Sequence, residues 1–239
     1  MVLHTVAAQA ADIKVFVTGA ARDAFNALAP QFERASGHKV SAQFDLPPSF
    51  LRRIEAGETF DVIILSMDVD GLIRQGKVVA DSRTALGRTG VGVVIRRGAP
   101  KPDFSTVDAF KRMLLESPSV TYSGEGSSGR YFLTLLDRLG LSEAIKPKLR
   151  TPTGVGGAPQ MLAKGEVALA VIGRPPVVGV PGVEWLGWIP DEIQSWIVFT
   201  AGLSTTASDP AAGRALLSFL TTPEAVAVFK AKGLDPVAP

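Results

Sequence analysis

Residues 123–131 read Ser-Gly-Glu-Gly-Ser-Ser-Gly-Arg-Tyr, and the interpretation of the chain starts from this stretch. A short β-like run, residues 119–122, precedes it, and apolar residues at helical spacing follow it as far as Gly140. A strand, a loop of glycines and serines, and a helix start can together bind an anion, because the first helical turn presents unpaired N–H groups and partial positive charge. The alternative is an ordinary capped helix after a flexible loop, and the short motif alone does not separate the two.

The composition limits the class of protein. The chain has 239 residues, 46% of them hydrophobic, enough for a sizeable core in one large or two small domains. No apolar run reaches the ~18 residues of a membrane-spanning helix, so direct membrane insertion is not expected. The 25 basic and 23 acidic residues are scattered along the chain, so no nucleic-acid partner is expected.

Residue types that carry much of enzyme chemistry are scarce. The chain contains no cysteine, which excludes thiol catalysis, disulfides and thiolate metal sites. The two histidines, His4 and His38, are far apart in sequence and are interpreted as surface residues, so a Ser-His-Asp hydrolase is not expected. We expect no metal and no cofactor.

The N-terminus suggests export. Ala8-Gln9-Ala10 resembles the small-x-small cleavage site of a secretory signal peptide, although the charged and apolar regions that precede such a site are missing. Residues 1–11 are interpreted as a signal-peptide remnant or a disordered start, and a periplasmic location is expected.

Strands alternate with helical segments along the chain, which predicts an α/β fold. Residues 13–17 and 39–44 have β character, and residues 61–65 form an almost continuous apolar run, as in a strand buried on both faces. In the helix that follows the first strand, Pro30 predicts a kink or break. Ser49 is expected to cap a short helix that ends near Ala56.

Two further segments are expected to connect separate parts of the molecule. The glycine-containing run 90–97 is a plausible crossing strand, and residues 196–203 could return the chain to the first part. Two amphipathic helices, residues 210–220 and 223–232, close the sequence.

In this order and spacing, the elements resemble the periplasmic substrate-binding proteins of ABC transporters, most closely the molybdate-binding protein-like branch. The resemblance covers nearly the whole chain from about residue 11. Each matching piece is short: Val15-Phe16 with Ala20-Ala21 and Asp23, Phe32-Glu33 to Gly37, Ile54 to Gly57 with Asp61-Val62, Leu72 to Gly76, Ser128 to Tyr131 with Leu139-Gly140, Gly165-Glu166, Phe219-Leu220 and Gly233.

The resemblance implies two α/β lobes of the type II periplasmic-binding-protein fold, with two mixed or parallel sheets flanked by helices and a ligand cleft between the lobes. The first lobe would comprise residues 12–89 and 201–239, and the second would comprise residues 90–200. It also implies a monomer that carries a small anion to the membrane subunits of an ABC transporter.

The expected ligand site lies where strand ends meet helix starts. Its candidate residues are Thr18, Gly19, Ala20, Arg22, Ser49, Ser127, Ser128, Gly129, Arg130 and Arg174. Molybdate binders have serines where this chain has Ala20 and Pro47, and a tyrosine near residues 172–173 where this chain has none. The arginines suit a carboxylate or another small organic anion, so carboxylates are expected to bind better than molybdate.

Glu125 introduces an alternative function. Some members of this broader group resemble binding proteins but are aconitate isomerases, which move a double bond by allylic proton transfer. Such an enzyme needs anion-binding groups and a base close to the carbon acid. Glu125 or Tyr131 could supply that base. The expectation for a binding protein is that it has no catalytic residue, and we expect no turnover of aconitate.

Overall fold

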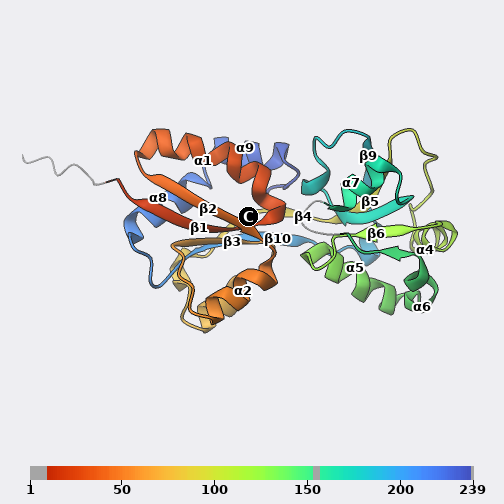
Figure 1. The fold of residues 1–239 in the computed structure, drawn as a ribbon, viewed down its shortest axis with the longest axis horizontal. Coiled ribbons are helices and arrows are strands. Elements are labelled where there is room, and N and C mark those ends of the chain that lie inside the picture. Colours follow the sequence, from red (N-terminus) through yellow and green to blue (C-terminus); the bar gives the residue numbers. More distant parts are fainter. Residues whose placement is uncertain (1–9, 153–156, 238–239) are drawn as a thin grey trace, which may run out of the picture.

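The computed structural model describes residues 10–152 and 157–237, which form two five-stranded sheets with helices on both sides of each (Figure 1). The first sheet has the strand order β2-β1-β3-β10-β4 and the second has the order β7-β6-β8-β5-β9. The strands are β1 Asp12–Thr18, β2 Lys39–Asp45, β3 Val62–Leu65, β4 Thr84–Thr89, β5 Val91–Arg96, β6 Val120–Tyr122, β7 Leu149–Arg150, β8 Leu169–Gly173, β9 Val183–Trp188 and β10 Ile197–Leu203.

Both sheets are mixed, because β10 runs antiparallel to β3 and β4, and β5 runs antiparallel to β8 and β9. The predicted α/β class is therefore confirmed. The helices are α1 Arg22–Ser36, α2 Pro47–Glu55, α3 Asp70–Arg74, α4 Val107–Glu116, α5 Ser127–Arg138, α6 Ser142–Ile145, α7 Gly157–Lys164, α8 Pro210–Phe219 and α9 Pro223–Ala231. Short 3-10 turns join them: η1 Gly19–Ala21, η2 Ala80–Ser82, η3 Lys146–Lys148, η4 Pro175–Val177 and η5 Asp191–Ile193.

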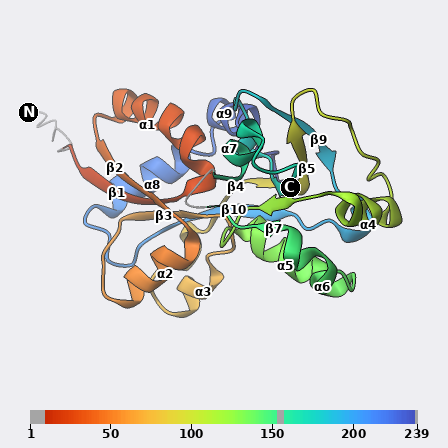
Figure 2. The same ribbon diagram turned by 45° about the vertical axis from the view of Figure 1, so that its right-hand side comes forward.

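Alternation along β1 gives the first sheet two apolar faces, since successive side chains of a strand point to opposite sides. Val15 and Val17 pack into the core formed with α1, α8 and α9. Phe16 packs on the other face with α2 and α3, and its ring stacks on Phe50 at 4.6 Å between centroids. We call this sheet and these five helices the first lobe; Figures 1 and 2 show α1 and α2 on opposite sides of it.

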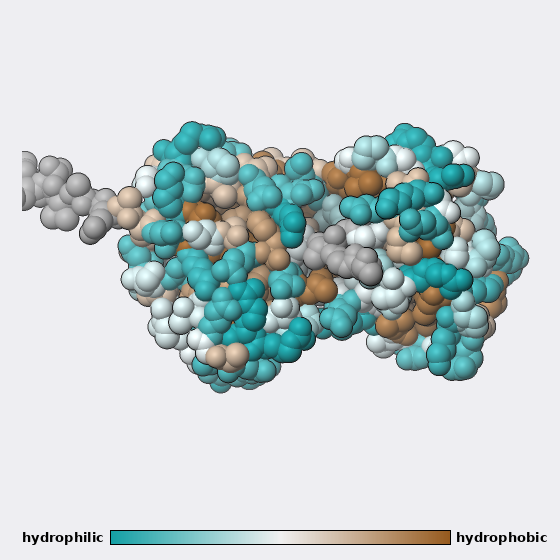
Figure 3. Space-filling view, in the orientation of Figure 1, coloured by the Kyte–Doolittle hydropathy of each residue, from teal (hydrophilic) through white to brown (hydrophobic). Residues whose placement is uncertain are grey.

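The second sheet is covered in the same way. Val93 and Ile95 on β5 face the core shared with α4, α5 and α6, whereas Val94 faces the smaller core shared with α7. This sheet and α4–α7 form the second lobe. In the space-filling view the outline narrows between the two lobes (Figure 3). Among the described residues, no helix has the length and apolar character needed to span a membrane.

The chain passes between the two sheets at Gly90, from β4 to β5, and again in the segment that joins β9 to β10. Gln194 in that second segment ties the two passages together. Its Oε1 accepts from the Val91 N–H at 2.8 Å, and its Nε2 donates to the Val91 carbonyl at 2.9 Å. The side-chain amide thus adds to the backbone bond that the Val91 carbonyl accepts from the Ile189 N–H at 3.1 Å.

The three tryptophans of the chain gather at the same junction. Trp185 and Trp188 on β9 meet edge to face at 4.7 Å, and Trp188 meets Trp196 at 5.5 Å. The Arg88 guanidinium lies 4.5 Å from the centroid of the Trp196 ring, a cation–π contact. Arg88 is near the end of β4, just before the first passage, and Trp196 is in the second passage, so this contact joins the two.

Two local predictions are wrong. α1 continues through Pro30, so the predicted break does not occur; Pro30 is exposed, and water can replace the hydrogen bond that proline removes. α2 begins at Pro47, and Ser49 inside it donates to the Asp45 carboxylate, so Ser49 is not the cap. Most of the predicted signal-peptide remnant, residues 1–9, lies outside the described residues.

Candidate functional site

A cavity of about 70 Å³ lies between the lobes, where the carboxyl ends of β1 and β3 meet the start of α5. This is the edge at which open α/β sheets bind ligands. The lining combines six hydroxyl residues with glycines, prolines and other apolar residues: Thr18, Ala20, Leu46, Ser66, Thr89, Ser123, Gly126, Ser127, Ser128, Pro152, Gly157, Ala158, Pro159, Ile172, Gly173, Pro175, Pro176, Ile197 and Phe199.

A chain of hydroxyl groups crosses from one lobe to the other beside this cavity. The Thr18 and Ser66 hydroxyl oxygens are 3.2 Å apart, and the Ser66 and Ser127 hydroxyl oxygens are 3.0 Å apart. The Ser127 hydroxyl also donates to the Ser66 carbonyl at 2.6 Å. Thr18 ends β1, Ser66 follows β3 and Ser127 opens α5, so three separate elements converge here.

A second hydroxyl pair belongs to the loop that precedes α5. The Ser123 and Ser128 hydroxyl oxygens are 2.7 Å apart, and Ser128 Oγ accepts from the Gly173 N–H at 3.3 Å. Thr89 Oγ1, at the passage between the sheets, accepts from the Arg174 N–H at 3.3 Å. The adjacent N–H groups of Gly173 and Arg174, at the end of β8, thus hold one hydroxyl from each lobe.

The helix that follows this loop has a free N-terminus. Among the described residues, no side chain caps α5, whereas Thr106, Asp209 and Thr222 accept from backbone N–H groups and cap α4, α8 and α9. The first N–H groups of an uncapped helix remain available to a ligand, and the helix dipole adds partial positive charge to them. The start of α5 is therefore a candidate anion-binding site.

Glycines allow this loop to fold closely over the start of the helix. Gly124 has φ +56°, a left-handed conformation that glycine adopts without strain. A Cβ on Gly129 would collide with the Gly124 carbonyl oxygen. The glycine at position 129 therefore permits the backbone contact that sets the loop against α5.

No side chain that ionises lines the cavity among the described residues. Of the predicted site residues, Thr18, Ala20, Ser127 and Ser128 are brought together in the lining, and Gly129 is buried directly beneath the loop. Gly19 and Arg22 line a neighbouring groove, where the exposed Arg22 guanidinium lies 4.9 Å from the Phe44 ring centroid.

The other predicted residues lie apart from the cavity. Arg130 is exposed on α5, and Arg174 is half-buried with its side chain in a groove shared with Arg97. Glu125 is exposed. The Tyr131 hydroxyl donates to the Ile193 carbonyl at 2.7 Å. Together with Ser49, which bonds to Asp45, these residues are not among the lining groups.

Sequence reasoning missed Ser66 and Thr89 as site residues. Ser66 comes directly after the buried run 61–65, at the carboxyl end of a strand, and the strand-end rule could have identified it. Thr89 had no comparable signal, because β4 lacks a regular apolar alternation.

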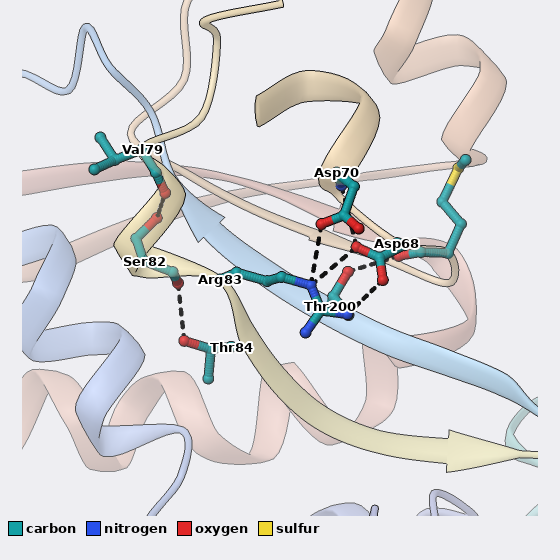
Figure 4. Close-up of polar contacts among 8 residues, drawn as sticks. Asp68, Asp70, Val79, Ser82, Arg83, Thr84 and Thr200 are labelled. Carbon is teal, nitrogen blue, oxygen red and sulfur yellow. Dashed lines mark hydrogen bonds and ion pairs between the residues drawn. The ribbon is translucent and has the colours of Figure 1, made fainter. Parts of the chain in front are cut away.

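Thr200 of β10 holds the segment that follows Ser66 (Figure 4). The fully buried Thr200 on β10 donates from Oγ1 to the Met67 carbonyl at 2.6 Å. Because Met67 is the next residue along the chain, this bond fixes the backbone beside Ser66.

A cluster of charged side chains, Asp68, Asp70 and Arg83, holds the same segment (Figure 4). Arg83 Nε lies 3.1 Å from Asp68 Oδ1 and 3.2 Å from Asp70 Oδ1, and a second guanidinium nitrogen also bonds Asp68. Hydrogen bonds from Arg83 lower the pKa of the Asp68 carboxyl to about 2. The cluster is partly exposed, so its role is to position the loop more than to stabilise the whole protein.

The family whose sequence pattern matches residues 13–235 is described as bacterial extracellular solute-binding protein. The chain belongs to this family. An aconitate isomerase from a Pseudomonas species is 32% identical over 94% of this chain and 88% of its own length. The molybdate-binding protein ModA of Azotobacter vinelandii is 30% identical over 97% of this chain and 92% of its own length. This solute-binding protein thus lies in the molybdate-binding-like, ABC-transporter branch.

Solved structures share the fold. The A. vinelandii periplasmic molybdate-binding protein matches with a TM-score of 0.76 at 20% identity, over 95% of this chain and 99% of that one. The sulfate-binding protein SubI of Mycobacterium tuberculosis also matches with a TM-score of 0.76, at 18% identity over 96% and 88% of the two chains. The solute-binding protein has the two-lobed type II fold.

Proposed function

We propose that this protein is an exported receptor that captures a small anion between its lobes and delivers it to an ABC importer. The observation that carries the proposal is the uncapped start of α5, which meets six hydroxyl residues at one cavity. Uncharged hydrogen-bond donors can bind an ionised group in a site that excludes water. The backbone N–H groups and hydroxyls then replace the hydrogen bonds that the anion makes to water. The absence of acidic side chains from the described lining agrees with an anionic ligand.

Closing of the lobes would complete the site. Ser66 belongs to the first lobe and Ser127 to the second, and their contact brings donors from both sides to one place. In this proposal the passages at Gly90 and between β9 and β10 act as hinges. The lobe limits expected from the sequence, residues 12–89 with 201–239 and residues 90–200, put one boundary at Gly90 and the other inside β10, just after the second passage. The protein works as a monomer and without a cofactor.

Equilibrium binding of a panel of anions tests the proposal. Isothermal titration should give one site per chain for at least one small anion, and the same anion should raise the melting temperature. A ligand that binds only the folded state adds ~2.7 kcal/mol of stability at a hundredfold excess over its Kd. If no oxyanion, monocarboxylate, dicarboxylate or tricarboxylate binds at millimolar concentration, the proposal is wrong.

A second candidate function is isomerisation of a tricarboxylate such as aconitate. The Pseudomonas aconitate isomerase, 32% identical along nearly the full length, favours it. Allylic proton transfer needs a base within reach of the bound carbon acid. The described lining offers no carboxylate, imidazole or amine, and Glu125 is exposed outside it. Binding is therefore the first proposal, and incubation with cis- and trans-aconitate followed by chromatography tests the second.

A further inference from the structure

A second close approach of the two lobes lies at Gly233, far from Ser66 and Ser127 in the sequence. Gly233 follows α9 in the first lobe and adopts φ +90°. A Cβ at this position would lie 3.1 Å from the backbone nitrogen of Pro175 and 3.1 Å from Val178 Cγ2, closer than most Cβ contacts in proteins. Pro175 opens η4 in the second lobe. The lobes therefore come this close because position 233 has no side chain.

The first lobe holds Gly233 in place. The Gly233 N–H donates to the Lys230 carbonyl at 3.0 Å, and the next residue, Leu234, is buried in the core shared with α1. Asp235 then pairs with Arg88 of β4 through two backbone hydrogen bonds of 2.7 and 2.8 Å. The turn cannot move away from η4 without disturbing these contacts, so a side chain at position 233 would push on the second lobe.

The part of the second lobe that Gly233 faces is a wall of the cavity. Pro175 and Pro176 both line the cavity, and Pro175 is buried. The preceding residue, Arg174, donates from its N–H to Thr89 Oγ1 at 3.3 Å, and Thr89 lines the cavity as well. A displacement of η4 therefore moves part of the lining.

The contact also lies close to the first passage between the sheets. Arg88, the backbone partner of Asp235, is only two positions before Gly90, where the chain crosses. A Cβ at Gly233 would require its neighbours to shift by a few tenths of an ångström. Because the lobes move by rotation about the passages, a small displacement beside a hinge becomes a larger one farther from it.

We propose that Gly233 is a positioning residue for anion capture. The missing side chain lets η4 approach the end of α9 and lets the lobes close over the cavity, and a larger residue at position 233 holds them apart. An anion that needs donors from both lobes binds the closed form, so its apparent Kd rises as that form becomes rarer. This inference rests on the proposed anion-binding function and identifies a residue outside the cavity that sets its affinity.

Distances between spin labels on the two lobes test the effect on closure. The chain contains no cysteine, so Ala215→Cys on α8 and Arg138→Cys on α5, both at exposed positions, place one label on each lobe. Pulsed electron paramagnetic resonance then measures the label-to-label distance, without anion and with the tightest-binding anion of the panel below. Gly233→Ala should shift this distance by ~1–2 Å relative to the wild type.

Gly37→Ala is the matched control. Gly37 also follows a helix at positive φ, +77°, but a Cβ there would meet nothing within 4 Å. Both substitutions place a Cβ at a left-handed backbone position, so both should lower the melting temperature. Gly37→Ala should leave the label distance unchanged, because Gly37 touches nothing in the second lobe.

Isothermal titration with propionate, molybdate, sulfate and trans-aconitate tests the effect on capture. Gly233→Ala should weaken the tightest of these about tenfold, as expected when the closed form becomes about tenfold rarer, and Gly37→Ala should change it less than about twofold. If Gly233→Ala does not fold, Gly233→Asn with Gly37→Asn as its control replaces the pair, because asparagine adopts positive φ more readily and still carries a Cβ.

The outcomes separate this proposal from anion capture itself. Unchanged label distances in the folded Gly233 variant overturn the positioning role, even when the wild type binds an anion. A shifted distance with unchanged affinity also overturns it, because the spacing of the lobes then does not set binding. If the wild type binds none of the four anions, anion capture fails and the role of Gly233 fails with it.

Discussion

The Ser66 and Ser127 hydroxyl oxygens are 3.0 Å apart, although 61 positions separate the two serines in sequence and they belong to different lobes. The bond exists only while the lobes are close together. Ser127 therefore both lines the cavity and joins the lobes, so its removal should affect anion capture.

Ser127→Ala should weaken binding of the best anion about tenfold, because it removes a hydroxyl from the cavity and the inter-lobe bond. Arg130→Ala, three positions later, should change the Kd less than threefold, because Arg130 is exposed outside the lining. Titration calorimetry measures both. Ser41→Ala, at an exposed serine that bonds Asp12, is the control. The reverse ranking, with Arg130→Ala the weaker binder, would place the anion on the outer face of α5.

Glu125→Gln should leave anion affinity unchanged or slightly higher, since Glu125 is exposed and its negative charge lies beside the loop before α5. The wild-type protein should show no interconversion of cis- and trans-aconitate. Chromatography of timed incubations measures turnover. A wild type that isomerises aconitate, with a fall of ~10²–10⁴-fold in Glu125→Gln, would identify Glu125 as the base.

Acid should weaken the Arg83–Asp68 ion pair that holds the segment after Ser66. The folded-state pKa of Asp68 is lowered from 3.8 to about 2, so its stabilising effect is complete above pH 4 and is lost as pH falls toward 2. In Asp68→Asn, the free energy of unfolding should depend less on pH between pH 4 and 2 than it does in the wild type. The difference should be less than ~1 kcal/mol, because the Arg83–Asp68 pair is partly exposed.

Arg83→Gln should reduce the pH dependence of the free energy of unfolding by the same amount. The double variant should show no further reduction beyond either single variant. Urea unfolding at several pH values measures all three. Equal pH profiles for wild type and Asp68→Asn would show that the ion pair contributes nothing to stability.

Gln194→Ala should destabilise the junction between the lobes. Val91 is fully buried, and the substitution leaves its N–H without the amide acceptor, at a cost of ~1–3 kcal/mol. The Val91 carbonyl loses the amide donor but keeps the backbone bond from the Ile189 N–H at 3.1 Å. Chemical unfolding measures the loss. Gln75→Ala, at an exposed position at the end of α3, is the control. A Gln194→Ala variant as stable as the control would mean that water replaces the amide at the junction.

Much of the fold was accessible from the sequence because its signals are local. The apolar run of β3 and the two C-terminal helices match the prediction to within about a residue. β4 and β9 were not predicted. β4 includes Gly87 and Arg88, and its pairing with β10 and with Asp235 depends on chain segments more than a hundred residues away.

The site was only partly accessible, and Arg130 shows why. A helix start rich in serine and glycine was recognised correctly as a structural element. The same helical spacing that identified it also places Arg130 with the exposed residues Leu133, Thr134 and Asp137, on the face opposite Phe132. Arg130 was predicted as a site residue because of its charge. Ser66 was missed because its hydroxyl contacts Ser127 across the lobes, and no local sequence pattern encodes such a contact.

The tryptophan cluster at the junction gives the molecule an internal optical signal of lobe movement. Trp188 on β9 touches Trp196, and Trp196 stacks under Arg88 of β4, so a change in the angle between the lobes alters the surroundings of an indole ring. The described cavity lining contains no tryptophan. Intrinsic fluorescence therefore follows hinge motion, and a change on adding anion separates closure from simple occupancy of the cavity.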